Sequence, residues 1–120
     1  MSFPFQIMSI VLDKENKIIP VFNDEIIKEY TEVLSRPRFK ISKSRIGKVI
    51  NDLKSVGLFV NRAKSNEYFP DPKDVVFYEV TMESKKRNES FLVTGNLKHF
   101  PKKPFVVTPS KMIEIIESKK

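Results

Sequence analysis

The chain alternates short apolar runs with longer stretches in which apolar residues recur every three or four positions. Apolar runs of strand length occur within residues 17–22, 58–60, 91–94 and 105–107, and turn-forming residues flank them. The run at 91–94 is apolar at almost every position, as expected of a strand covered on both faces. Strands that alternate with helices favour an α/β fold with a mainly parallel sheet flanked by helices.

Helix signals lie between these strands. Asn23 or Asp24 is placed to cap the helix that follows the first strand. A second helix ends at Gly57, which predicts a left-handed residue at that helix end. Two further helices are predicted, one over about residues 74–84 and one that starts at Pro109 after a threonine cap.

The first dozen residues, MSFPFQIMSIVL, are mostly apolar. They have no basic lead-in and no small-residue cleavage site, so a signal peptide is not indicated. They are also shorter than the roughly 20 residues that a membrane helix needs. We interpret them as a buried helix fragment. In the strand that follows, Pro20 has no N–H to donate, which predicts that this strand lies at a sheet edge or is interrupted there.

Composition narrows the classes of function. The 120 residues fit a single domain over residues 1–120. The net charge of +7 indicates either a polyanionic partner or a basic protein that binds nothing. The absence of Cys excludes a cysteine nucleophile and a thiolate metal site, and a reducing, cytoplasmic location fits. Three Gly do not form a phosphate-binding loop, and the single His99 does not supply a Ser-His-Asp arrangement.

Carboxylates and amides remain as candidates for chemistry. Carboxylate oxygens and water are the ligands of hard cations such as Mg²⁺, and the candidates are Glu29, Asp71, Asp74 and Asn96. Each has a simpler explanation. The two aspartates are placed to cap a helix, Glu29 fits a solvated helix position, and residues 94–96 fit an ordinary turn. From the residues alone these simpler explanations are favoured over a metal site.

Four segments carry a more specific signal: FNDEIIKEYTEVLSRPRF, DPKDVVFYEV, FLVTGNLKHFP and FVVTPSKMIEII. In this order and at these separations they resemble the PIN domain (PilT N-terminus), and more narrowly its toxin branch from bacterial toxin–antitoxin systems. The resemblance covers nearly the whole chain from Ile18 onward. It implies a doubly wound sheet and an endoribonuclease that depends on Mg²⁺ or Mn²⁺. It also implies that Glu29, Asp74 and Asn96 are catalytic, with Glu29 and Asp74 as metal ligands and Asp71 as an alternate ligand.

The resemblance further implies RNA as the substrate and an antitoxin protein as a partner. A homodimer is expected as well, because it would bury exposed apolar surface. Seven residues are expected to bind nucleic acid, five from the basic region after the first helix and two from the turn after the strand at 91–94. They are Arg36, Arg38, Lys40, Lys43, Arg45, Thr94 and Lys98.

The chain departs from the family at its start, where the opening strand with its D-T-N element is missing. In the family that strand is central to the sheet and supplies the first metal ligand. We therefore expect an N-terminally truncated PIN-like domain with weakened metal binding and a sheet with a gap or with unpaired edges. Two hypotheses follow: a metal-dependent ribonuclease, weak or inactive in this form, and a non-catalytic remnant that binds nucleic acid or a partner protein.

Overall fold

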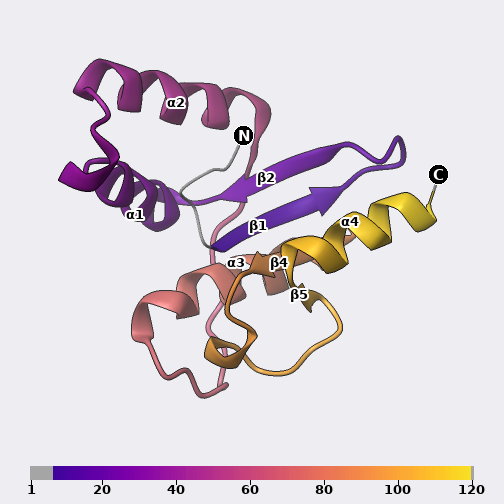
Figure 1. Cartoon of the computed structure of the whole chain (residues 1–120). Coiled ribbons are helices and arrows are strands. Elements are labelled where there is room, and N and C mark those ends of the chain that lie inside the picture. The colour runs from indigo at the N-terminus through magenta and orange to yellow at the C-terminus, as the bar shows by residue number, and fades with distance from the viewer. Residues whose placement is uncertain (1–6, 120) are drawn as a thin grey trace.

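The computed structural model of the protein describes residues 7–119. Its centre is a five-stranded sheet with the strand order β3-β2-β1-β4-β5 (Figure 1). β2 pairs with β3 in parallel and β4 with β5 in parallel, whereas β1 is antiparallel to both of its neighbours, β2 and β4. Four strands therefore share one direction, as a mainly parallel sheet requires, and β1 runs against them. The strands are β1 (Ile7–Leu12), β2 (Ile18–Phe22), β3 (Leu58–Phe59), β4 (Ser90–Thr94) and β5 (Val106–Val107).

The apolar N-terminal segment was expected to be a helix fragment, and this prediction is wrong for residues 7–12, which form β1. The first six residues of that segment lie outside the described residues. β1 pairs on both sides, with Ile10 opposite Pro20 of β2 and Phe91 of β4. Without β1, β2 and β4 would each present an unpaired edge at the centre of the sheet. The antiparallel β1 thus occupies the centre of the sheet, and the gap expected there is not found among the described residues.

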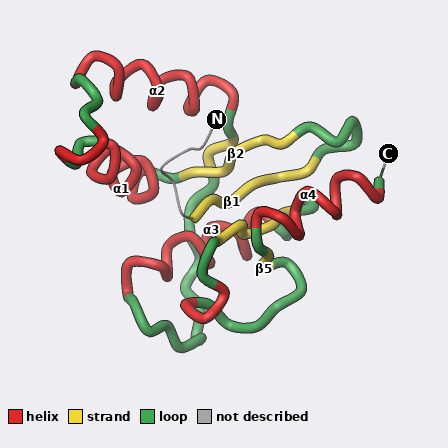
Figure 2. Tube along the Cα trace, in the orientation of Figure 1, coloured by secondary structure: helices red, strands yellow, loops and turns green. Residues whose placement is uncertain are grey.

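Four helices flank the sheet (Figure 2). α4 crosses the sheet on the viewer's side, and α3 lies behind it, in contact with β1 and β4. Local capping bonds mark where helices begin: the side chain of Asn23 accepts the Ile26 N–H, and that of Thr108 accepts the Lys111 N–H. The helices are α1 (Asp24–Leu34), α2 (Lys43–Val56), α3 (Val75–Ser84) and α4 (Pro109–Ser118). None of the helices formed by residues 7–119 has the length and apolar character needed to cross a membrane.

Pro20 and Gly57 both lie at the β2–β3 side of the sheet. β2 is an interior strand, and its pairing with β3 begins only after Pro20, at Val21, so the predicted interruption at this proline is confirmed on that side. Gly57 is not left-handed, since its φ is −91° and its ψ is 176°. The glycine is required by close approach instead. A Cβ at this position would lie 2.8 Å from the Leu53 carbonyl oxygen and 2.9 Å from that of Pro20, which is closer than a methyl group tolerates.

Candidate active site

A cavity of about 250 Å³ lies between α1 and the start of α3. Three carboxylates from three different segments line it: Glu29 on α1, Asp71 at the end of the long loop before α3, and Asp74 just before the first residue of α3. Ile7 also lines the cavity, and it pairs with Thr94, the last residue of β4. The cavity is therefore at the edge where the parallel strands end, which is where α/β sheets build their sites.

Packing between α1 and α3 brings Glu29 to this cavity. The neighbouring residue Tyr30 is buried, its ring lies 5.9 Å from that of Phe77 on α3, and its hydroxyl donates to the Ile7 carbonyl at 3.0 Å. Glu29 itself is half-buried. The simpler reading of Glu29 as a fully solvated helix residue is therefore not what the structure shows.

The two aspartates differ in whether helix capping explains them. The side chain of Asp71 accepts the Lys73 N–H at 3.0 Å, so this residue does act as a cap, on the short 3₁₀ turn Pro72–Asp74. Asp74 makes no side-chain capping bond. Its Oδ2 lies 3.1 Å from Nδ1 of His99 instead. Helix capping therefore explains Asp71 but leaves the Asp74 carboxylate for other chemistry.

The surroundings of Asp74 disfavour its ionised form. Asp74 is 6% exposed, and burial together with the nearby Asp71 charge raises the pKa of its carboxyl. His99 acts in the opposite direction, and Glu29 adds a smaller contribution that also raises the pKa. A cation bound beside Asp74 would stabilise the ionised form of this carboxyl, because an opposite charge favours the charged state.

His99 is a site residue that sequence reasoning set aside. It ends the 3₁₀ turn Leu97–His99, whose backbone closes through the His99 N–H to the Asn96 carbonyl at 3.2 Å. The buried Phe100 that follows packs its ring 6.2 Å from Phe69 and fixes the turn against the loop before α3. The available signal was the position of the histidine within the N-L-K-H-F-P segment, three residues after the candidate Asn96.

The turn after β4 does not reach the cavity in the way the resemblance implied. Asn96 and Lys98 are exposed, Thr94 is buried, and none of the three lines the cavity. The Asn96 N–H donates to the Thr94 hydroxyl at 3.0 Å, which is the geometry of an ordinary turn. Asn96 is connected to Asp74 only through the His99 that follows it. Its catalytic role stays a prediction.

Basic side chains surround the cavity on one side. Arg36 and Arg38 line it together with Lys73, and Lys40, Lys43 and Arg45 are exposed further along the same part of the chain. Within residues 7–119, no carboxylate pairs with any of these six side chains. The Arg38 guanidinium lies 4.9 Å from the centre of the Phe39 ring. These positive charges are therefore available to an anionic ligand.

The donor chemistry of the cavity fits a hard divalent cation held weakly. Among the described residues, no three His, Asp or Glu side chains are close enough to form a metal cage. Mg²⁺ does not need one, because it is commonly bound by one or two carboxylates and several waters. β1 contributes only the apolar side chain of Ile7 to the cavity and no ligand.

Fold and site together define an α/β domain with an acidic cavity and a basic rim at the carboxyl ends of its parallel strands. A family model described as PIN domain matches residues 2–98, and the chain belongs to the PIN domain family. No curated protein and no solved structure matches the chain. Membership indicates a nuclease-type function and nucleic-acid binding, and PIN domains generally use a divalent metal.

Proposed function

We propose that the protein is a metal-dependent endoribonuclease with weak activity on single-stranded RNA. The observation that carries this proposal is the shared cavity. Glu29, Asp71 and Asp74 line it beside the basic side chains of Arg36, Arg38 and Lys73. Among the described residues, no ion pair joins these carboxylates to these basic side chains. The carboxylates would hold Mg²⁺ or Mn²⁺. When bound, such an ion lowers the pKa of a coordinated water and offsets charge on the scissile phosphate.

The other side chains around the cavity have separate roles in this proposal. Arg36, Arg38 and Lys73 bind the phosphates next to the cleaved bond and fix the strand over the cavity. His99 holds the Asp74 carboxylate in place through Nδ1. Ile7 excludes water from one wall but supplies no ligand. With one carboxylate fewer than the family pattern implies, metal affinity and turnover are low.

The test is cleavage of a fluorescent single-stranded RNA in Mn²⁺. We expect slow cleavage by the wild-type protein that disappears in Glu29→Gln and Asp74→Asn and in the presence of a chelator. The matched control is Glu32→Gln, an exposed carboxylate on the same helix, which should cleave at the wild-type rate. Equal rates in the wild type and in both site variants would show that the activity comes from elsewhere.

A non-catalytic RNA-binding domain is the second candidate, and a specific observation favours it. Ile7 occupies the edge position of the central strand, and His99 already engages Asp74. In this case the protein binds RNA without cleaving it. The affinity falls as salt rises, because phosphate contacts release counterions. Arg38→Ala should reduce the slope of log affinity against log salt by about 0.7, whereas Lys14→Ala at the distant β1–β2 turn should not. A wild-type affinity for RNA that does not change with salt concentration would contradict this candidate.

A toxin role with an antitoxin partner, and a homodimer, are part of the same proposal. The resemblance supports the toxin role, and the apolar side chains exposed along the β3 edge support an interface. Val56 is 66% exposed and Phe59 is 49% exposed. Sedimentation of the purified chain tests the dimer directly, since a stable monomer at micromolar concentration would remove it.

A further inference from the structure

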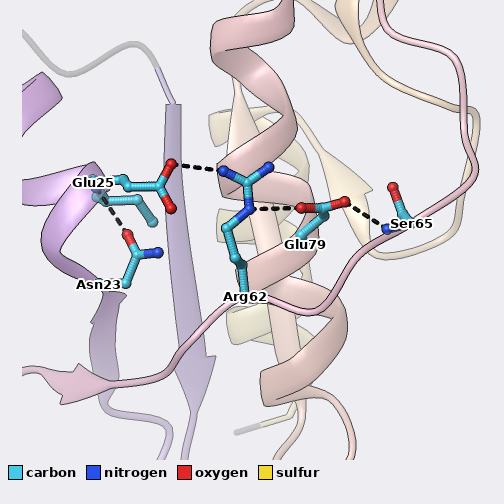
Figure 3. A network of polar contacts seen from close by, with 6 residues as sticks. Asn23, Glu25, Arg62, Ser65 and Glu79 are labelled. Atoms are coloured by element: carbon cyan, nitrogen blue, oxygen red, sulfur yellow. Dashed lines mark hydrogen bonds and ion pairs between the residues drawn. The ribbon is translucent and has the colours of Figure 1, made fainter.

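The long segment between β3 and α3 forms no helix or strand from residue 60 to residue 69, yet it carries the most connected ion pair network among the described residues. Figure 3 shows the guanidinium of Arg62 between two carboxylates from different helices. Its Nε lies 2.7 Å from Oε1 of Glu79 on α3, and its Nη1 lies 2.6 Å from Oε2 of Glu25 on α1. One loop residue thus joins two helices.

Glu79 is the buried end of this network. It is 3% exposed, and its second oxygen, Oε2, accepts the Ser65 N–H at 2.5 Å. Burial alone would raise its pKa, but the Ser65 N–H and the Arg62 guanidinium together hold the pKa of Glu79 below its ordinary value. The carboxylate is therefore ionised at neutral pH and fixes the loop at residues 62 and 65.

The three segments that Arg62 joins are the three segments that supply the cavity with carboxylates. Glu25 lies one helical turn before Glu29 on α1, on the same face. The loop that contains Arg62 ends at Asp71. Glu79 belongs to the helix that Asp74 precedes. Any change in the angle between α1 and α3 therefore changes the distances among the cavity carboxylates.

Both helices pack against the sheet, α1 on β2 and α3 on β1 and β4. Two contacts link α1 to α3 directly. The rings of Tyr30 and Phe77 lie 5.9 Å apart, and the Arg62 bridge attaches to α1 nearer its start, at Glu25. The bridge therefore adds a second point at which the orientation of α1 relative to α3 is fixed. The bridge adds little to stability, because Glu25 is half exposed and exposed ion pairs contribute about 0–1 kcal/mol. Its effect is on the orientation of α1 relative to α3.

We propose that Arg62 is a positioning residue, which braces α1 against α3 through Glu25 and Glu79 and so sets the distance between Glu29 and Asp74, the two carboxylates offered to a divalent cation. The metal part of this inference rests on the proposed function. The brace itself does not, because it concerns the relative placement of two helices.

The experiment separates these parts. The sequence contains no Cys, so Glu32→Cys on α1 and Met82→Cys on α3, both exposed positions, allow two nitroxide labels. The distance distribution between the labels is measured by double electron–electron resonance, and Mn²⁺ affinity is measured on the unlabelled chain. Glu25→Gln breaks only the bridge to α1 and leaves Arg62–Glu79 and the loop intact. Glu25→Asp keeps the charge but shortens the side chain.

We expect the distance distribution to broaden or shift in Glu25→Gln, Glu25→Asp and Arg62→Met, and not in the control Arg87→Met. Mn²⁺ affinity should fall by a factor of up to about 5 in the Glu25 variants, because an exposed ion pair of about 0–1 kcal/mol shifts a conformational equilibrium by no more than that, and at least as much in Arg62→Met. Unchanged distances in Arg62→Met would overturn the brace. If the wild type binds no Mn²⁺ but the distances change, the brace stands and the metal proposal fails. If the distances change and Mn²⁺ affinity does not, the positioning role for the metal is refuted.

Discussion

Replacing Asp74 with asparagine should make the protein more stable at pH 7.5 while it removes metal binding. The wild-type carboxylate is buried beside Asp71 and Glu29, and burial and the Asp71 charge raise its pKa, so its ionised form carries a cost in the folded state. Asparagine has the same shape and no charge, and its side-chain oxygen can still accept from His99. Removing a strained functional group of this kind typically stabilises by about 0.5–2 kcal/mol. For a chain of this length, 1 kcal/mol corresponds to a Tm increase of about 4 °C.

The sign of the pH dependence follows from the raised pKa of Asp74. Between the unfolded and the folded pKa, the folded protein binds more protons than the unfolded chain, so wild-type stability falls as pH rises through that interval. The stabilisation that protonated Asp74 provides is fully present below the unfolded pKa of about 3.9. Asp74→Asn does not lose stability in this way as pH rises. Its gain in free energy of unfolding over the wild type should therefore be small near pH 4 and reach its full value at pH 7.5.

Thermal unfolding followed by circular dichroism in a chelator, at both pH values, measures this difference. Asp52→Asn, at an exposed position on α2, is the matched control and should change Tm little at either pH. Added Mn²⁺ should raise the Tm of the wild type by mass action and leave that of Asp74→Asn unchanged. A variant that is less stable than the wild type at pH 7.5, or whose advantage is the same at both pH values, would refute the repulsive carboxylate cavity.

Two further substitutions test the fold around the site. Gly57→Ala should lower the free energy of unfolding by about 1–3 kcal/mol, because the new methyl group would lie 2.8 Å from the Leu53 carbonyl oxygen; urea unfolding with no change in midpoint would contradict this close approach. Ile10→Ala should cost about 2–5 kcal/mol, since Ile10 is 3% exposed at the centre of the sheet, whereas Ile113→Ala on the exposed face of α4 should cost little. Equal losses in these two variants would argue against β1 as the central strand.

Local signals in the sequence predicted most elements of the fold. The cap and first-turn proline at Thr108 and Pro109 start α4 where expected, and the apolar run at 91–94 lies within β4. The N-terminal segment was misread because a short apolar run has no period that separates a buried helix from a buried strand. What decides its structure is the space between β2 and β4, which is a property of the whole sheet and not of the segment.

The candidate site was also predicted only in part. The resemblance identified Glu29, Asp71 and Asp74, and the structure brings all three to one cavity. His99 was missed because its contact with Asp74 joins positions 25 residues apart, and Arg62 reaches Glu25 across 37 residues. No spacing rule within a helix, strand or turn encodes such contacts. They form only when segments far apart in the sequence fold against one another.

We propose that the cavity lined by Glu29, Asp71 and Asp74 binds a divalent cation. Substoichiometric Mn²⁺ added to ¹⁵N-labelled protein tests it most directly, because the paramagnetic ion broadens amide signals according to their distance from it. The account predicts that the amides of these three residues broaden first, that α4 signals such as that of Ile113 persist, and that Asp74→Asn abolishes the pattern. Uniform broadening, or broadening centred away from the cavity, would contradict it.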